Sequence, residues 1–275
     1  MNEQGIQYIK REKPIKIELF NDHFQNFKVY GIPKAQLVIA DIPYNLGVNA
    51  YASNPMWYEG GDNKNGESKY AGKEFFDTDK DFRIAEYMHF CNRLLKPEPK
   101  EKGKAPAMIV FCAFEQMQTV IEHGKKYGFQ NSYPLVFIKN YSAQVLKANM
   151  KIVGATEYAV VLYRDKLPKF NNGRTETSKG KMIFNWFEWK RDNSKEYPKI
   201  HPTQKPVGLL KQLIEIFTDE GDIVIDPVAG SGTTLRACAE LKRSCYGFEI
   251  KKDFYRDAKE KMLSNIAVQE KIGGC

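Results

Sequence analysis

The 275-residue sequence is poor in cysteine and histidine, and the positions of these residues exclude the sites they most often build. Its five cysteines are scattered, odd in number and never spaced as C-x-x-C, so neither a disulfide framework nor a zinc site is expected. The four histidines form no catalytic or metal-binding pattern, and no metal is predicted. Reduced thiols of this kind favour a cytoplasmic protein.

Long apolar runs are absent as well. No stretch approaches the ~20 residues that a membrane-spanning helix needs, so no membrane segment is expected. The amino terminus, MNEQGIQYIKREKP, lacks the apolar stretch of a signal peptide, which again favours the cytoplasm. Acidic residues are in the minority: 42 Lys and Arg against 34 Asp and Glu give a net charge of +8. This balance favours an anionic partner.

Short apolar runs alternate along the chain with amphipathic stretches of helical spacing. Continuous apolar runs are typical of parallel strands that are buried on both faces. The runs lie at 36–40, 107–112, 136–138, 158–163, 222–225 and 244–248. The amphipathic stretches lie at 82–95, 209–217 and 235–241. This alternation predicts an α/β fold with a mostly parallel sheet and helices on both faces.

A glycine-rich turn, Asp226-Pro-Val-Ala-Gly-Ser-Gly-Thr-Thr234, joins one buried strand to a helix. Gly230 and Gly232 let the backbone turn sharply and approach a ligand. The helix amino terminus offers unpaired N–H groups that suit a carboxylate. About twenty residues later, Glu249 ends a strand where it can accept hydrogen bonds from both ribose hydroxyls. The GxxxxGK[ST] pattern of a phosphate-binding loop is absent, and a tight turn without a ligand is the alternative.

A second turn, Asp41-Ile42-Pro43-Tyr44, ends another buried strand and should lie along the same sheet edge. An exocyclic amine is a poor nucleophile because its lone pair is delocalised into the ring. The Asp41 carboxylate and the Ile42 backbone carbonyl can accept its hydrogens and make the nitrogen more tetrahedral. Tyr44 can stack on a base that is flipped out of the duplex. Taken alone, this tetrapeptide fits an ordinary strand-ending turn equally well.

Together these motifs resemble the β class of DNA amino-methyltransferases, in which the catalytic motif precedes the cofactor motif. Residues 41–44 resemble the D/N/S-P-P-Y catalytic motif, and residues 226–234 resemble the cofactor motif. His201-Pro-Thr-Gln-Lys-Pro206 resembles the segment before the cofactor strand. The resemblance spans residues 17–263. It implies a Rossmann-like methyltransferase fold with permuted motif order, S-adenosylmethionine as cofactor and double-stranded DNA as partner. A homodimer is left open, since dimers occur in similar enzymes.

The resemblance also implies roles for individual residues. Lys205 and Thr203 would lie close to the methionine end of the cofactor. The implied catalytic residues are Asp41, Ile42, Pro43 and Tyr44. The implied cofactor contacts are His201, Thr203, Lys205, Asp226, Pro227, Ala229, Gly230, Ser231, Gly232, Thr233 and Glu249.

The first two residues of the catalytic motif bear on the reaction. Asp41 resembles the adenine enzymes, whereas serine there more often accompanies cytosine N4 methylation. We therefore expect methylation of adenine N6, with cytosine N4 as the alternative. Ile42 stands where the family most often has proline, so the carbonyl acceptor is kept but the fixed φ is lost. This leaves a non-catalytic DNA-binding relative as a second alternative. The resemblance also implies that the protein is part of a restriction–modification system, although the sequence itself contains no nuclease motif.

Residues 139–199 carry thirteen Lys and Arg against six Asp and Glu, a net charge of +7, with aromatics between them. In the β class this interval holds the target-recognition region. The expected division is therefore 1–163 for the catalytic half, 164–199 for target recognition and 200–275 for the cofactor half of the same domain. A solvated charged face, with the aromatics in a small core of their own, is the alternative. The expected phosphate contacts are Lys139, Arg174, Lys179, Lys181, Lys190 and Arg191.

An irregular loop over residues 45–80 interrupts the catalytic half and is rich in Gly, Asn, Tyr and Ser. Long irregular segments in a compact domain are often functional. The loop is expected to cover the flipped base or the cofactor. Trp57, Tyr58 and Tyr70 either wedge into DNA or pack the loop itself.

Overall fold

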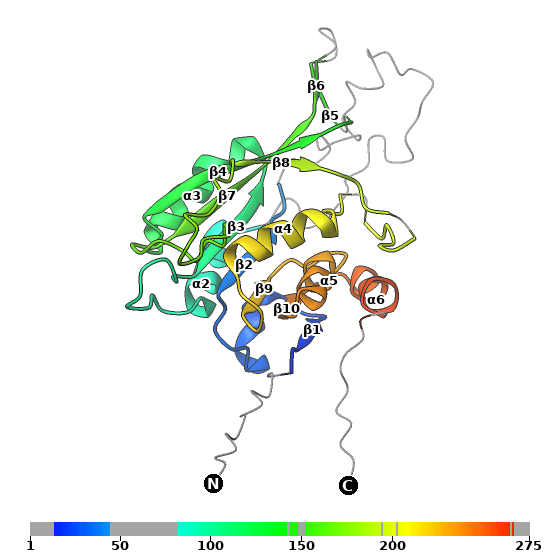
Figure 1. Ribbon diagram of the computed structural model, residues 1–275. Coiled ribbons are helices and arrows are strands. Elements are labelled where there is room, and N and C mark those ends of the chain that lie inside the picture. The colour runs from blue at the N-terminus through cyan, green and yellow to red at the C-terminus, as the bar shows by residue number, and fades with distance from the viewer. Residues whose placement is uncertain are drawn as a thin grey trace, which may run out of the picture.

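The computed structural model describes residues 14–44, 82–141, 144–147, 152–193, 195–201, 203–264 and 266. Most of them form one sheet with helices on both faces, as Figure 1 shows. The strand order is β1-β10-β9-β2-β3-β7-β4-β8. Pairing is parallel except on the two sides of β7, which is antiparallel to β3 and to β4. The predicted class, an α/β fold with a mostly parallel sheet, is confirmed.

The main sheet and a small hairpin account for the described strands. The sheet strands are β1 (Ile17–Phe20), β2 (Leu37–Asp41), β3 (Ala107–Cys112), β4 (Asn131–Lys139), β7 (Thr156–Tyr163), β8 (Trp186–Trp189), β9 (Ile223–Asp226) and β10 (Ser244–Phe248). The hairpin pairs β5 (Gln144–Lys147) with β6 (Ile152–Gly154). The α-helices are α2 (Ile84–Leu94), α3 (Met117–Lys126), α4 (Val207–Phe217), α5 (Thr233–Glu240) and α6 (Lys252–Asp257). Shorter helical turns are η1 (Phe24–Tyr30), η4 (Phe114–Gln116) and η6 (Ala258–Met262).

Two apolar cores lie on the two faces of the sheet. Successive side chains of a strand point to opposite faces. Leu37 and Ile39 of β2 accordingly join the core beneath α4 and α5, while Val38 and Ala40 join the core beneath α2. Burial on both faces explains why this strand is apolar throughout. No helix in the described part of the chain is long and apolar enough to cross a membrane.

Every apolar run predicted as a strand is a strand, and the three predicted helices correspond to α2, α4 and α5. Some elements have a weaker hydrophobic pattern and were not predicted from the sequence. They are the edge strands β1 and β8, the β5–β6 hairpin and helix α3. In β8 the burial alternates, with Phe187 and Trp189 buried between exposed neighbours. An edge strand of four residues gives too short an alternation to stand out.

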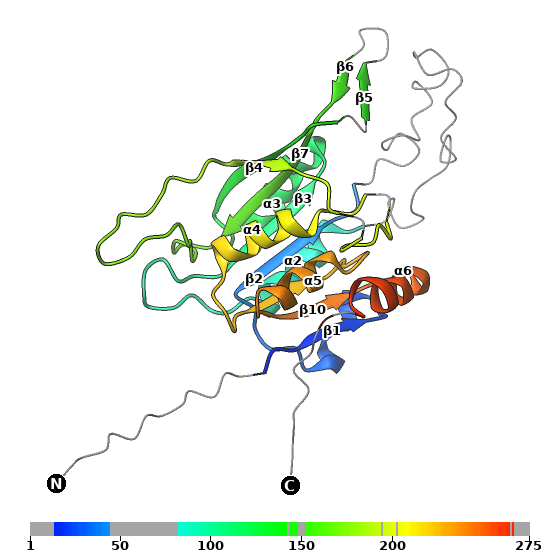
Figure 2. The same cartoon turned by 45° about the vertical axis from the view of Figure 1, so that its right-hand side comes forward.

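The reversed direction of β7 determines where the basic residues between β7 and β8 lie. Because β7 runs against the other strands, the chain that follows it leaves the sheet at the edge opposite the carboxyl ends of β2 and β9. Strand β8 then pairs in parallel with β4 and returns to the carboxyl edge at Trp189. Figure 2 shows the long loop before β8 on the side of the sheet away from the β5–β6 hairpin. Phe187 and Trp189 join the main core, so they do not form a core of their own.

Candidate functional site

A cavity of about 420 Å³ opens at the carboxyl edge of the sheet. Strands β2 and β9 are neighbours there, so the turns that follow them meet. In open α/β sheets ligands bind at this edge. Nearly all the residues singled out in the three motifs line the cavity. They are Asp41, Ile42, Pro43, Tyr44, His201, Thr203, Lys205, Asp226, Pro227, Ala229, Gly230, Ser231, Thr233 and Glu249.

The two glycines of the glycine-rich turn have different surroundings. Both have positive φ, +51° at Gly230 and +76° at Gly232. A Cβ on Gly230 would meet no atom within 4 Å, which fits its place on the cavity wall. A Cβ on Gly232 would lie 3.3 Å from the Cβ of Ala258. Gly232 is the N-cap of α5, where the lack of a side chain lets η6 pack closely; it is not among the residues that line the cavity, and its contact with the cofactor stays a prediction.

Glu249 reaches the cavity from the end of β10 and is held by backbone groups. Its Oε2 accepts a hydrogen bond from Gly230 N at 2.9 Å, and its Oε1 accepts one from Lys251 N at 2.7 Å. Burial raises the pKa of this carboxyl, and the hydrogen bonds and charge of Lys251 partly oppose the rise. Each oxygen has a further lone pair. The arrangement therefore suits a pair of ribose hydroxyls.

Asp226, at the end of β9, is only 4% exposed. Its Oδ1 accepts a hydrogen bond from Val228 N at 3.1 Å. Burial, together with the negative charges of Asp41 and Glu249, raises the pKa of Asp226 to about 7. A cation bound in the cavity would favour the ionised form. The cavity thus holds a carboxyl group whose charge responds to a cationic ligand near neutral pH.

The segment 200–205 is a turn held largely by its own side chains. Gln204 Oε1 accepts a hydrogen bond from Ile200 N at 3.0 Å. His201 Nδ1 lies 3.0 Å from Thr203 Oγ1, and burial and the charge of Lys205 lower its pKa to about 4. The imidazole is therefore neutral. Residue 202 of this motif lies outside the described residues.

Lys205 connects this turn to the turn formed by Asp41–Tyr44. Its Nζ lies 2.6 Å from Asp41 Oδ2 and 3.0 Å from Glu157 Oε2. Burial works to lower the pKa of Lys205, but the two carboxylates outweigh it and leave the pKa above its ordinary value. The ammonium is therefore charged. Its amino group contacts the Asp41 carboxylate, and the place of Lys205 beside the methionine end of the cofactor stays a prediction.

Glu157 and Lys139 extend the same cluster of charges behind Lys205. Glu157, on β7, forms ion pairs with Lys205 and with Lys139. Lys139 is 9% exposed, and its Nζ lies 4.7 Å from the centroid of the Trp189 ring. The prediction of Lys139 as a phosphate contact is therefore not supported. The end of β4 lies beside the start of β7, so Lys139 turns to a carboxylate that its sequence neighbours do not reveal.

The backbone of the turn formed by Asp41–Tyr44 is fixed by two hydrogen bonds. Ile42 N donates to the carbonyl of Phe111 on β3 at 3.1 Å. Proline has no N–H and could not make this bond, so strand pairing constrains Ile42 where a ring would constrain proline. Gln116 donates through Nε2 to Pro43 O at 3.0 Å, and its Oε1 accepts from Ala113 N at 3.1 Å. No motif in the sequence points to Gln116.

Asp41 pairs one carboxylate oxygen, Oδ2, with Lys205, and its other oxygen, Oδ1, is buried. Its side chain is 30% exposed. Within the described residues Oδ1 has no hydrogen-bond partner. Burial raises the pKa of this carboxyl; Lys205 lowers it and Glu157 raises it. The group is therefore a buried acceptor on a residue that lines the cavity.

The exposed residues predicted to contact phosphates lie at two opposite ends of the sheet strands. Lys190 and Arg191 follow β8 at the carboxyl edge and are exposed, and the guanidinium of Arg191 lies 3.7 Å from the centroid of the Tyr141 ring. Asp192 fixes this position because its Oδ2 accepts a hydrogen bond from Val207 N, at the start of α4, at 2.8 Å.

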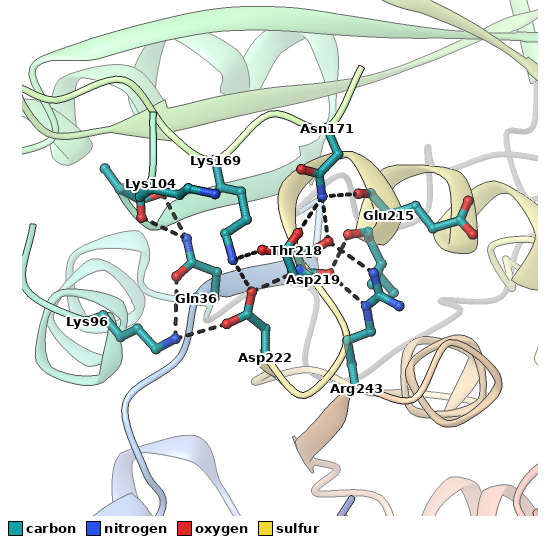
Figure 3. A network of polar contacts seen from close by, with 12 residues as sticks. Gln36, Lys96, Lys104, Lys169, Asn171, Glu215, Thr218, Asp219, Asp222 and Arg243 are labelled. Atoms are coloured by element: carbon teal, nitrogen blue, oxygen red, sulfur yellow. Dashed lines mark hydrogen bonds and ion pairs between the residues drawn. The ribbon is translucent and has the colours of Figure 1, made fainter. Parts of the chain in front are cut away.

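Arg174, Lys179 and Lys181 lie in the loop that leaves β7 at the far edge. Polar contacts tie the start of this loop to the chain just before β9, as Figure 3 shows. Lys169 Nζ lies 2.7 Å from an Asp219 oxygen, and Asn171 Nδ2 donates to Thr218 O at 2.8 Å. The structure therefore separates these three basic residues from the cavity. The loop 45–80, with Trp57, Tyr58 and Tyr70, lies outside the described residues.

Comparison with known proteins agrees with this geometry. A family model described as DNA methylase and named for N6 and N4 methyltransferases matches residues 35–260. The type II methyltransferase M.HpaI of Haemophilus parainfluenzae is 25% identical over 87% of this chain and 73% of its own length. The DNA adenine methyltransferase YhdJ of Escherichia coli strain K12 is 25% identical over 88% and 80%. The crystal structure of the M1.HpyAVI complex with S-adenosylmethionine superposes with a TM-score of 0.60 at 22% identity, covering 89% of this chain and 99% of that one.

Proposed function

The chain belongs to the DNA methylase family of S-adenosylmethionine-dependent N6 and N4 amino-methyltransferases, and from this premise we propose that it methylates the N6 amino group of adenine in duplex DNA. One observation carries the proposal: the aspartate-led turn after β2 and the glycine-rich turn after β9 line the same cavity. A base and a cofactor bound at these turns would face each other. Holding two reactants in this way lowers the barrier by proximity.

The residues of the cavity fit S-adenosylmethionine, which supplies an electrophilic methyl group when bound. Glu249 has an oriented carboxylate for the ribose hydroxyls. Gly230 leaves open space at the wall. The amino terminus of α5 suits a carboxylate. Asp226 suits the cationic part of the cofactor, because its ionised form gains from a nearby positive charge.

The catalytic turn supplies what the substrate amine needs. Asp41 Oδ1 is a buried acceptor without a partner in the described residues, so it can accept one amine hydrogen. The backbone carbonyl of Ile42 can accept the other, and its N–H bond to Phe111 keeps the backbone in place. Tyr44 lines the cavity and can stack on the flipped base. Two acceptors of this kind favour the tetrahedral, nucleophilic form of the nitrogen.

Adenine is proposed over cytosine because aspartate leads the catalytic turn, as in the adenine enzymes. YhdJ, which is named as an adenine methyltransferase, is among the relatives. The family also contains N4 methyltransferases, so cytosine N4 is the second candidate.

Target recognition is proposed for the parts of residues 139–199 that reach the carboxyl edge. Lys190 and Arg191 lie at this edge. The β5–β6 hairpin, which connects β4 to β7 in the sequence, extends from the same edge. Of the expected recognition region, residues 164–199, the proposal keeps the end that includes β8, and it adds the β5–β6 hairpin, which lies outside that region.

The test is a product analysis. The purified protein is incubated with S-adenosylmethionine and unmethylated genomic DNA, and the DNA is digested to nucleosides for mass spectrometry. We expect N6-methyldeoxyadenosine, lost in Asp41→Ala and kept in the exposed control Asp253→Ala. N4-methyldeoxycytidine would overturn the choice of base. No methylated base, with cofactor and DNA binding intact, would favour the non-catalytic alternative.

A further inference from the structure

Four charged side chains from different parts of the chain form a row of ion pairs in which acidic and basic residues alternate. The row ends at Asp41, in the wall of the cavity. The row runs from Asp41 at the end of β2, through Lys205 before α4 and Glu157 on β7, to Lys139 at the end of β4. We infer that Glu157 is a positioning residue for methyl transfer: it holds Lys205 against Asp41 and thereby fixes the carboxylate that accepts the substrate amine. This inference rests on the proposed function.

The stability of the fold does not explain why Glu157 and Lys139 are buried beside Lys205. The side chains of Lys205, Glu157 and Lys139 are 5%, 9% and 7% exposed. Taking charges out of water is costly, and apolar residues of similar volume often serve a core as well or better. Lys205 and Asp41 already neutralise each other. Adding Glu157 and Lys139 buries two more charges, so a role other than folding is the better explanation.

The geometry shows what Glu157 adds. A lysine ammonium sits on a flexible four-carbon stem and donates in three directions. The Phe111 and Trp189 rings lie 5.2 and 5.5 Å from Lys205 Nζ, and aromatic faces attract a cation without giving it one direction. Glu157 Oε2 lies 3.0 Å from Nζ and has no hydrogen-bond partner among the described residues, so this ion pair gives the ammonium a second carboxylate that has no other donor on that oxygen. With Lys205 held on Asp41 Oδ2, the buried Oδ1 keeps its lone pairs for the amine of a bound base.

The charges of the same row also influence the pKa of Asp41. The groups that face Asp41 are Lys205, Glu157 on β7, Asp226 on β9, Cys112 on β3 and Tyr44 of its own turn. Lys139 stands behind Glu157 and offsets its charge. Loss of the Glu157 charge should lower the pKa of Asp41, whereas loss of the Lys139 charge should raise it. A role confined to packing would not shift the two variants in opposite directions.

The experiment compares wild type with Glu157→Gln, Glu157→Asp and Lys139→Met. It measures kcat, the KM for DNA, the calorimetric Kd for S-adenosylmethionine and the pH profile of kcat/KM. Glu157→Gln should lower kcat by on the order of tenfold, since a small misplacement of reacting groups is costly. The cofactor Kd should stay within about twofold, because no cofactor group is expected at Glu157. The acid limb should move to lower pH in Glu157→Gln and to higher pH in Lys139→Met. Glu157→Asp should recover part of kcat.

Thermal melting of each variant, with the exposed Glu122→Gln as control, separates loss of fold from loss of rate. Should Glu157→Gln fail to fold, Glu157→Asp and Lys139→Met carry the same test. A wild-type kcat in Glu157→Gln, or acid limbs that move together or not at all, would overturn the inference. An inactive wild type would instead overturn the proposed function, so the two failures are distinguishable.

Discussion

Lys205 Nζ lies 2.6 Å from Asp41 Oδ2, although the two residues stand 164 positions apart in the sequence. This ion pair joins the segment before α4 to the turn after β2 at the wall of the cavity. It means that a residue expected beside the cofactor acts on the group that is proposed to receive the substrate.

Replacing Lys205 with glutamine should therefore affect the chemical step more than cofactor binding. Lys205 lowers the pKa of Asp41, so its loss should raise that pKa and leave two facing carboxylates, Asp41 and Glu157, without a cation between them. Asp41 accepts hydrogen bonds at both oxygens only when ionised. Activity should thus fall further near pH 6 than near pH 8. Measured kcat/KM profiles check this; an equal loss at both pH values would contradict it.

Much of the fold follows from sequence, for a definite reason. A strand buried on both faces, such as β2, has to be apolar throughout, and this pattern is visible without a structure. Parallel strands end at one edge, so the turns after β2 and β9 were expected to meet, as they do. These are consequences of local sequence and of one general rule of sheet architecture.

The contacts that could not be predicted depend on pairings between distant segments. The reversed direction of β7 places Arg174 away from the cavity and brings Glu157 beside Lys205. Neither follows from the residues of β7 itself, which is apolar enough to fit either direction. Gln116 likewise reaches the catalytic turn from the chain after β3, through a side-chain contact that no spacing encodes.

Cofactor binding should depend on pH through Asp226. The pKa of this carboxyl is raised to about 7, mainly by burial, and a bound cation favours its ionised form. Binding below that pH must therefore release a proton, so affinity should rise as the pH increases to about 7 and level off above it. Calorimetry in buffers of different ionisation enthalpy measures the proton release. Asp226→Asn should bind the cofactor more weakly and release no proton through this group.

The stability of Asp226→Asn provides the control. A carboxyl with a raised folded-state pKa stabilises the fold at low pH and loses that contribution as the pH rises from about 4 to about 7. Without cofactor, the asparagine variant should melt at least as high as wild type near pH 8. A lower melting temperature there would mean that weaker binding reflects a damaged fold.

Gly232→Ala should destabilise the protein without removing a cavity contact. The residue has a φ of +76°, and a Cβ would lie 3.3 Å from the Cβ of Ala258. The left-handed backbone alone should cost about 1–2 kcal/mol in the free energy of unfolding. The matched control is Gly208→Ala, in the first turn of α4, where φ is not positive and a Cβ meets nothing within 4 Å, so alanine should not destabilise the protein. Urea unfolding measures both; equal stabilities would show that the conformation of Gly232 is not limiting.

The two groups of exposed basic residues should differ in their contribution to DNA binding. The double variants Lys190→Gln/Arg191→Gln and Lys179→Gln/Lys181→Gln each remove two positive charges, so they change the net charge equally. Only the first pair lies at the edge that holds the cavity. Its loss should weaken duplex binding by on the order of tenfold and reduce the slope of log Kd against log salt by up to about two. Fluorescence anisotropy at several salt concentrations measures both quantities. Equal losses in the two variants would mean that DNA binding follows overall charge and that the edge position of Lys190 and Arg191 has no special role.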